Sequence, residues 1–309
     1  MQRDSRLDTL KFLLIFLVVL GHLSYKDYGL GINRLIYSFH MPLFVFLSGF
    51  FTTNRHDNEG IARKKHIKWV RKTLLIFILA QLGHSLLTIF LGGKASWTML
   101  IYPQLALWYL ICLVYWRITI WTIDDKLNDQ ILFTLSVCLC LLSGIIPLND
   151  EFSFQRAFAF FPFFVTGYIF RKRNLISKID EIPIWKALLV AIICLFAARV
   201  IPRTYMPKFH YDTFNDFFAR GVQSVLGFFL SLSVFRLSRC IKTDKIAQLG
   251  TYTLWIYIGH TYLIRLNIPK LLEEQFHITF NMFGAFSLSI VYCFLFVFLA
   301  KLYQRLWLK

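Results

Sequence analysis

The amino-acid sequence predicts an all-α fold, a polytopic membrane bundle of about ten transmembrane helices with both termini in the cytoplasm. Three observations predict it. Of the 309 residues, 57% are hydrophobic, above the roughly 45–50% that is typical of soluble domains. The apolar residues form blocks of membrane-spanning length, and the mean hydropathy is +0.57. Most of the 34 Lys and Arg residues stand in short segments between those blocks.

The apolar blocks mark ten candidate spans, because a bilayer core needs about 20 mostly apolar residues per helix. The first, 7–25, follows basic residues as a signal peptide would, but no small-residue cleavage site comes after it, so we expect a retained helix. Spans 36–52 and 157–171 contain Pro42 and Pro162, which membrane helices tolerate when neighbours satisfy the freed carbonyl. The ten are 7–25, 36–52, 71–92, 99–121, 131–147, 157–171, 184–201, 217–236, 251–267 and 282–305.

The formal net charge of +17 would suit nucleic acid or an anionic membrane surface. Because the cations cluster between apolar blocks, we expect a membrane partner and no nucleic acid. With the N-terminus inside, alternate connecting segments carry most of the Lys and Arg, as the positive-inside rule requires. We therefore expect one membrane domain over residues 1–309, in a bacterial inner or plasma membrane.

The six Cys residues lie in or beside apolar blocks without metal-ligand spacing. We expect small buried side chains, with no disulfide framework and no metal site.

The first span carries two ionisable candidates, since such groups are costly inside a bilayer. Asp8 and Lys11 lie three residues apart and can pair along one helix face. His22 follows Lys11 by eleven residues, roughly 16 Å along the axis and on nearly the same face. The alternative is that Lys11 snorkels to the inner surface and His22 only sits at the outer interface.

The second span begins with His40 and carries Ser48 and Gly49 deeper in the bilayer. A short connection places His22 and His40 at similar depth, which suggests an outer site. Gly49 permits a close helix contact, and Ser48 can hydrogen-bond across helices. The alternative is two unrelated interfacial histidines.

The basic stretch 63–72, with sequence RKKHIKWVRK, leads into the third span. Its Lys68, Arg71 and Lys72 could bind the phosphates of a cytosolic donor through charge-assisted bonds. They could equally be a positive-inside anchor or a lipid headgroup contact.

Further candidates lie in later spans. Arg156 opens the sixth span at its outer end, as an interfacial anchor or part of a site. We expect Trp108 and Tyr109 in the middle of the span 99–121, and His260 in the middle of the ninth span. The outer segment 202–216, with aromatic and charged residues, is either a roof over an outer site or a solvated loop.

Five segments together resemble the membrane acyltransferase-3 family, and most of all its short sugar O-acetyltransferase members. They cover nearly the whole chain in the order RLDTLKFLLIFLVVLGH, FHMPLFVFLSGFF, LWYL, RAFAFFPFFVTGYIF and LGTYTLWIYIGH. The resemblance implies ten helices and transfer of an acyl group from cytosolic acyl-CoA to an extracytoplasmic hydroxyl. The acceptor would be a surface polysaccharide or a lipid-linked glycan.

The resemblance also implies roles for particular residues. The family's first-helix motif is a basic residue, ten residues, and then an essential His, which here are Lys11 and His22. Lys stands where the family often has Arg, so bidentate geometry is lost. The family's cytoplasmic pair of arginines corresponds approximately to Lys68 and Arg71. The expected sets are His22, His40 and Arg156 for catalysis, Lys11, Lys68, Arg71 and Lys72 for the acyl donor, and Ser48, Trp108 and Tyr109 for the acceptor.

The resemblance favours acetyl-CoA as a donor substrate, with no tightly bound cofactor. His22 could act as a general base on the acceptor hydroxyl or form an acyl-imidazole. The sequence offers no obvious carboxylate partner for it within the spans. It also leaves open the acceptor sugar and a homo-oligomer.

Two other functions share the helical frame. A transporter or flippase for a lipid-linked sugar would show inverted repeats or paired broken helices, and the sequence shows neither. A membrane scaffold or sensor would not need a basic residue and a His aligned on one helix.

Overall fold

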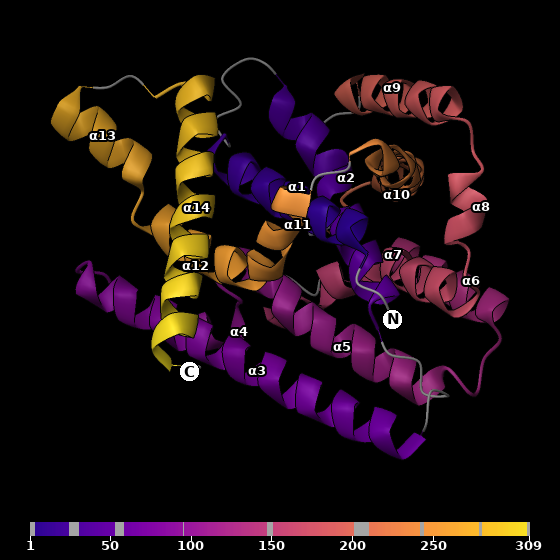
Figure 1. Ribbon diagram of the computed structural model, residues 1–309. Coiled ribbons are helices and arrows are strands. Elements are labelled where there is room, and N and C mark those ends of the chain that lie inside the picture. Colours follow the sequence, from indigo (N-terminus) through magenta and orange to yellow (C-terminus); the bar gives the residue numbers. More distant parts are fainter. Residues whose placement is uncertain are drawn as a thin grey trace. The chain divides into compact units, whose positions relative to one another are not determined.

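The computed structural model describes residues 4–24, 31–52, 59–94, 96–146, 151–200, 210–241, 244–277 and 280–307. Throughout these ranges every regular element is a helix, which confirms the all-α fold class (Figure 1). Four of the described helical segments are long and apolar enough to cross a membrane: Gly60–Phe90, Leu105–Ile123, Phe214–Cys240 and Met282–Leu306. The count of ten spans and the cytoplasmic termini stay predictions.

The chain divides into two compact units. Unit 1 comprises Met1–Phe44, Asp180–Ile201 and Leu226–Lys309, and unit 2 comprises Val45–Ile179 and Pro202–Val225. The prediction of one domain over residues 1–309 is not tested by this division and stays a prediction.

Helix α1 (Ser5–Leu23) is the central helix of unit 1. Asp4 caps its N-terminus by accepting a hydrogen bond from the Arg6 backbone N–H at 3.0 Å. The helix packs against α11, α12 and α14, and Leu14 and Ile15 are fully buried among them. The other helical segments of unit 1 are the first part of α2 (Ile32–Phe50), α9 (Ile184–Val200), the later part of α10 (Phe214–Leu237), η3 (Ser238–Cys240), α11 (Asp244–Leu249), η4 (Gly250–Tyr252), α12 (Thr253–Arg265), α13 (Ile268–Phe276) and α14 (Met282–Trp307).

Unit 2 is built around contacts of α3 with α5 and of α7 with α5 and α6. The end of α2 also crosses α7 closely, because a Cβ atom on Gly49 or Gly167 would run into the facing helix backbone at Phe164 or Phe46. The helices of unit 2 are α3 (Glu59–Phe90), α4 (Thr98–Ile101), η1 (Leu105–Leu107), α5 (Trp108–Ile123), α6 (Asp129–Leu142), η2 (Glu151–Ser153), α7 (Phe154–Lys172) and α8 (Ile176–Asp180), with the ends of α2 and α10.

The predicted span 99–121 is wrong in its first part. Helix α4 stops at Ile101, and Tyr102 is extended at ψ 111° because it precedes Pro103. The Gln81 side chain bridges this break by donating to the Tyr102 carbonyl at 2.8 Å and accepting from the Gln104 N–H at 3.1 Å. The long helix α5 therefore begins only at Trp108.

Other predicted boundaries also move. The third helix begins at Glu59, so the basic stretch 63–72 belongs to it. The ninth span is shorter than predicted, because η4 precedes α12, which ends at Arg265. Helices α2 and α7 do continue through Pro42 and Pro162, as expected.

All six cysteines are free in the structure, and the prediction that they are buried is right for four of them. Cys138 and Cys240 are exposed. Many large apolar side chains are exposed too, including Phe90 at 84% and Phe283 at 78%. Such surfaces are expected where lipid, not water, surrounds a helix.

Candidate active site

Four aromatic rings of unit 1 form one group, here called the histidine group: His22, Tyr37, His40 and His260. The His22 ring centroid lies 5.5 Å from that of His260 and 6.5 Å from that of Tyr37. Tyr37 in turn lies 4.8 Å from His40 in an edge-to-face contact. The structure thus brings His22 and His40 to the same group, with Tyr37 between them.

The end of α1 is fixed against the start of α2 by local contacts. Asn33 donates through Nδ2 to the carbonyls of Gly21 and Ser24, each at 3.0 Å, which satisfies acceptors at the helix end. Gly21 lets the Tyr37 ring approach, since an added Cβ would lie 3.1 Å from a Tyr37 ring carbon. These contacts hold His22 beside α2.

Two of the histidines have a defined tautomer. His40 Nδ1 lies 2.6 Å from the Ile36 carbonyl, and His260 Nδ1 lies 3.0 Å from the Ile256 carbonyl. A carbonyl only accepts hydrogen bonds, so each Nδ1 carries the proton. In the neutral ring Nε2 is then the proton-accepting nitrogen. Both rings are buried, with His40 2% and His260 0% exposed.

Sequence reasoning missed Tyr37 as a member of this group and gave His260 no role. Signals for both were present. Tyr37 stands three residues before His40, which places the two on one helix face. His260 ends one of the five segments that carry the family resemblance, but its proximity to His22 depends on the packing of α12 against α1.

Four other predicted residues form a second group in unit 2, the arginine–aromatic group: Ser48, Trp108, Tyr109 and Arg156. The Ser48 and Tyr109 hydroxyls form a short hydrogen bond. The Arg156 guanidinium lies 5.2 Å from the Trp108 ring centroid, within the range of a cation–π contact. Trp108 also stacks on Phe160 at 5.4 Å.

The expected mid-span position of Trp108 and Tyr109 is wrong, because they are the first two residues of α5. Arg156 lies in the first turn of α7. Three members of the arginine–aromatic group therefore lie at the N-terminal ends of α5 and α7, and Ser48 comes from α2. That this group acts together with His22 and His40 stays a prediction.

The predicted Asp8–Lys11 pair is confirmed, with Lys11 Nζ 2.6 Å from Asp8 Oδ1. The Asp8 carboxylate is buried and Lys11 is only partly exposed. Part of the Lys11 charge is thus already balanced inside α1.

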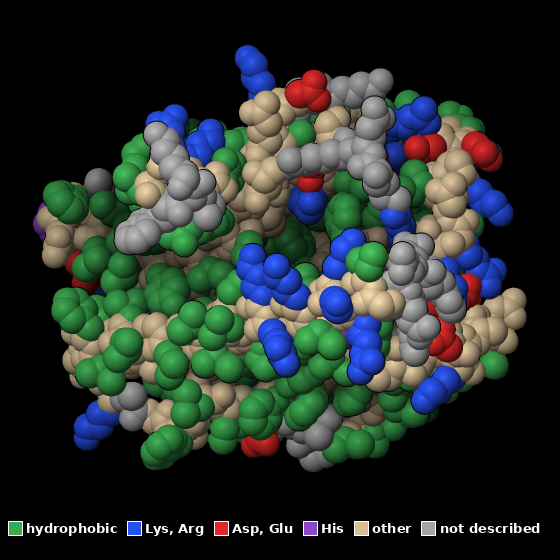
Figure 2. All heavy atoms as spheres, turned by 60° about the horizontal axis from the view of Figure 1, so that its bottom comes forward, with side chains coloured by type: hydrophobic (Ala, Val, Ile, Leu, Met, Phe, Trp, Pro, Cys, Tyr) green, Lys and Arg blue, Asp and Glu red, His purple; other side chains and the backbone are tan. Residues whose placement is uncertain are grey.

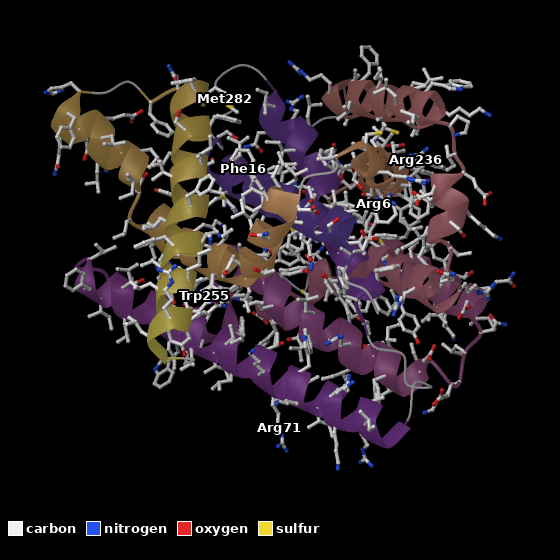
Figure 3. All side chains as sticks on the ribbon, in the orientation of Figure 1. Arg6, Phe16, Arg71, Arg236, Trp255 and Met282 are labelled. Carbon is white, nitrogen blue, oxygen red and sulfur yellow. The ribbon has the colours of Figure 1, made fainter. Side chains whose placement is uncertain are left out.

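The basic stretch of helix α3 has one exposed face and one face that packs against another helix. Lys68, Arg71 and Lys72 are exposed and share one face at helical spacing, here called the basic face. Figure 3 shows Arg71 projecting outward from α3. Figure 2 shows Lys and Arg side chains among hydrophobic ones on the side that it brings forward.

The other face of the same stretch packs against α5. The Arg117 guanidinium lies 3.9 Å from the Trp69 ring centroid, and His66 stacks on Trp121 at 4.4 Å. This packing turns the basic face of α3 away from α5.

The outer segment predicted as a roof is described only from residue 210 onward; Tyr205 and Lys208 lie outside the described residues. Tyr211 donates to the Leu141 carbonyl at 2.5 Å, and the buried Arg220 lies 4.6 Å over its ring. Tyr211 thus packs against α6 and α10.

Throughout the described ranges, no group of three or more His, Cys, Asp or Glu side chains could hold a metal ion.

Helices with membrane-spanning length, lipid-type exposed surfaces and buried ionisable side chains define this chain as an integral membrane protein of the α-helical class. A family model described as an acyltransferase domain, Acyl_transf_3, matches residues 4–302. The chain belongs to this acyltransferase family and is an acyltransferase. No curated protein and no solved structure matches it.

Proposed function

We propose that this acyltransferase transfers an acetyl group from cytosolic acetyl-CoA to a hydroxyl of an extracytoplasmic glycan or lipid-linked sugar, in a bacterial inner or plasma membrane. The observation that carries the proposal is the histidine group, where His22 of α1 meets rings of α2 and α12. An imidazole in such a group suits proton abstraction from a hydroxyl near neutral pH. Family membership favours acyl transfer over the transporter and scaffold alternatives.

The donor binds at the basic face of α3. Lys68, Arg71 and Lys72 are exposed cations at helical spacing, and the CoA phosphates offer them charge-assisted hydrogen bonds. Lys11, held by Asp8, adds a cation on the helix that also carries His22. The pantetheine arm carries the thioester, which reacts at His22.

At the reacting centre, His22 takes the proton of the acceptor hydroxyl while the oxygen attacks the thioester carbonyl. The C–O bond forms, the C–S bond breaks, and the proton passes to the departing CoA thiolate. In the covalent alternative, a His22 nitrogen attacks the thioester carbonyl, the C–S bond breaks, and the CoA thiolate leaves with the proton that His22 releases. The acceptor oxygen then attacks the acyl-imidazole, the C–N bond breaks, and the hydroxyl proton passes to the freed imidazole. His40 helps to orient the base.

The arginine–aromatic group serves the acceptor side. The Arg156 guanidinium is a cation of the kind that stabilises a developing oxyanion. Trp108 and Tyr109 offer rings and a hydroxyl to a sugar, and Ser48 positions the Tyr109 hydroxyl. Membrane lipid surrounds the bundle, and acetyl-CoA is consumed as a substrate without a tightly bound cofactor.

The test incubates membranes that contain the protein with labelled acetyl-CoA and follows label on surface polysaccharide and lipid-linked sugar. We expect labelling by the wild type and none by His22→Ala at equal membrane content. His277→Ala, which removes an exposed histidine at the end of α13, is the matched control and should label normally. Undiminished labelling by His22→Ala contradicts the mechanism, and an unlabelled wild-type sample contradicts the function.

A further inference from the structure

We propose that α13 (Ile268–Phe276) is an interfacial helix: it lies along the membrane surface and buries its apolar face at the boundary between lipid headgroups and acyl chains. The partner of this face is lipid. The inference goes beyond the proposed function and does not depend on it, because α13 contains none of the candidate site residues. The sequence alone predicts only a connection here, between the spans 251–267 and 282–305.

The residues of α13 divide into an apolar side and a charged side. Lys270, Glu273 and Glu274 lie on the charged side, where Lys270 Nζ is 3.5 Å from Glu274 Oε1. Such a division is typical of helices that lie along a membrane surface. Four apolar residues recur three or four positions apart and share the opposite side of the helix: Ile268, Leu271, Leu272 and Phe276.

The rest of the described chain leaves this apolar side largely uncovered. None of the nine residues of α13, all of them described, is buried, and Phe276 is 65% and Leu271 41% exposed. The ends of the helix are nevertheless sharply defined, because Asn267 and His277 flank it in left-handed conformations at φ 51° and 55°. A helix this short is marginal in water unless an amphipathic face is packed. It therefore needs an apolar surface outside the chain.

The place of α13 in the chain indicates that this surface is the bilayer. Only Leu266 and Asn267 separate it from α12, and five residues separate it from α14. The segment that begins at Met282 is long and apolar enough to cross a membrane. At no more than about 3.6 Å per residue, Phe276 lies within about 22 Å of Met282. Helix α13 is thus tethered close to the point where a membrane-crossing helix begins.

The charges of α13 indicate how it binds lipid. The helix contains one Lys and two Glu residues, so its net charge is −1. Anionic headgroups would repel this charge, so burial of apolar surface must drive the contact. We therefore expect α13 to bind a neutral lipid surface, with little dependence on salt, since screening acts on charge interactions.

An interfacial α13 would restrict the movement of α12. The connection of two residues is too short to let α12 slide far across the bilayer while α13 stays at the surface. Helix α12 packs against α1 and α14 within unit 1. Helix α13 thus fixes the depth at which α12 meets these helices.

The test measures where spin labels on α13 lie in the full-length protein, reconstituted into phosphatidylcholine vesicles. In a cysteine-free background, Leu272→Cys and Phe276→Cys label the apolar side, and Lys270→Cys and Glu274→Cys label the charged side. Collisions with oxygen, which concentrates in lipid, are compared with collisions with a water-soluble nickel complex. Phe298→Cys, at an exposed position of α14 within the segment that can cross a membrane, is the reference for lipid contact.

We expect labels on the apolar side to collide mainly with oxygen, at a depth of about 5–10 Å in the lipid boundary. Labels on the charged side should collide mainly with the nickel complex. The pattern should persist when anionic phosphatidylglycerol is added and when the salt concentration is raised. Two positions on each side keep the comparison possible when one variant fails to fold, which thermal unfolding detects.

Three results would overturn the inference. Dominant collisions with the nickel complex at all four positions indicate a solvated segment. Protection of the apolar side from both reagents indicates contact with protein instead of lipid. A pattern that appears only with anionic lipid indicates binding by charge. Because the measurement requires no acyl transfer, none of these results bears on the proposed function.

Discussion

At the residue scale, the histidine group shows how one ring acquires a defined chemical role from its own helix. His40 and His260 each donate through Nδ1 to a carbonyl four residues earlier. That bond lies within one helix and needs no residue from another, and it leaves Nε2 as the accepting nitrogen of the neutral ring. The sequence contains the histidines, but only the backbone conformation decides their tautomers.

Lys68 and Arg71 are the cations that we propose bind the phosphates of acetyl-CoA. Replacing both with Ala should raise the dissociation constant for acetyl-CoA about 10-fold or more, because charge-assisted bonds to phosphate are lost. Binding of labelled acetyl-CoA to solubilised protein measures this effect. The control removes two cations elsewhere, with Lys178→Ala and Lys186→Ala, and should bind normally. Equal affinity in the Lys68/Arg71 variant and the wild type would remove these residues from the donor site.

Asp129 provides a second prediction, at the start of α6 and before the predicted span 131–147. Burial by itself raises the pKa of Asp129, but hydrogen bonds from Arg173 and Lys172 outweigh it and hold the pKa below its usual range. Lys172 Nζ lies 3.1 Å from Asp129 Oδ1 and 2.8 Å from Asp124 Oδ1. These ion pairs join the ends of α5, α6 and α7.

Because the folded-state pKa is lowered, the stabilisation by Asp129 is complete above the ordinary Asp value of 3.8 and is lost as the pH falls through the lower folded value. We expect Asp129→Asn to lower Tm by about 2–4 °C at pH 6, and the difference to shrink toward pH 3. Thermal unfolding in detergent measures both. Asp125→Asn, an exposed neighbour, should change Tm less. A Tm difference between the wild type and Asp129→Asn that stays constant down to pH 3 contradicts the ion-pair explanation.

At the element scale, glycine decides how closely two helices of unit 2 approach. Gly49 of α2 and Gly167 of α7 each face backbone of the other helix, at Phe164 and Phe46. Neither helix could come so near with a side chain at these positions. The sequence indicated that Gly49 permits a close contact, and α7 is the partner that the structure supplies.

Gly49→Ala and Gly167→Ala should therefore each destabilise the protein by about 1–3 kcal/mol, the usual range for an overpacked interface. Gly60→Ala is the matched control, because nothing lies within 4 Å of an added Cβ there. That change should be neutral or slightly stabilising, since Ala favours helix. Thermal unfolding in detergent compares the three, and equal stability of all three variants would show that the helices can separate without loss.

The helix break at Tyr102 and Pro103, before α5, shows what hydropathy alone does not detect. Hydropathy averaged over residues 99–121 indicates one span, because it does not register that Pro103 lacks an N–H and restricts Tyr102. The Gln81 side chain of α3 donates to the Met99 carbonyl, four residues before Pro103, and to the Tyr102 carbonyl where the helix has ended. A proline signals a possible break in sequence, but whether a helix continues depends on such partners, as the unbroken α7 at Pro162 shows.

At the scale of the whole molecule, the predicted topology places the basic stretch 63–72 inside and the connection after span 71–92 outside. In a cysteine-free background, we expect Lys65→Cys and Lys178→Cys to react in intact cells only with membrane-permeant thiol reagents. Ser96→Cys, between α3 and α4, should react with impermeant reagents as well. Disruption of the membrane should make all three positions reactive. The reverse pattern in intact cells would invert the orientation.

The sequence by itself determined that the chain is helical and built for a membrane, because hydropathy and charge are summed over many residues and tolerate local errors. It also determined the Asp8–Lys11 pair and the main site candidates, since residues three or four apart on one helix must share a face. Only the tertiary structure decided that His260 of α12 lies beside His22 of α1, and that Ser48 meets Tyr109. These contacts join residues far apart in the chain, and they depend on how helices pack, which no local pattern specifies.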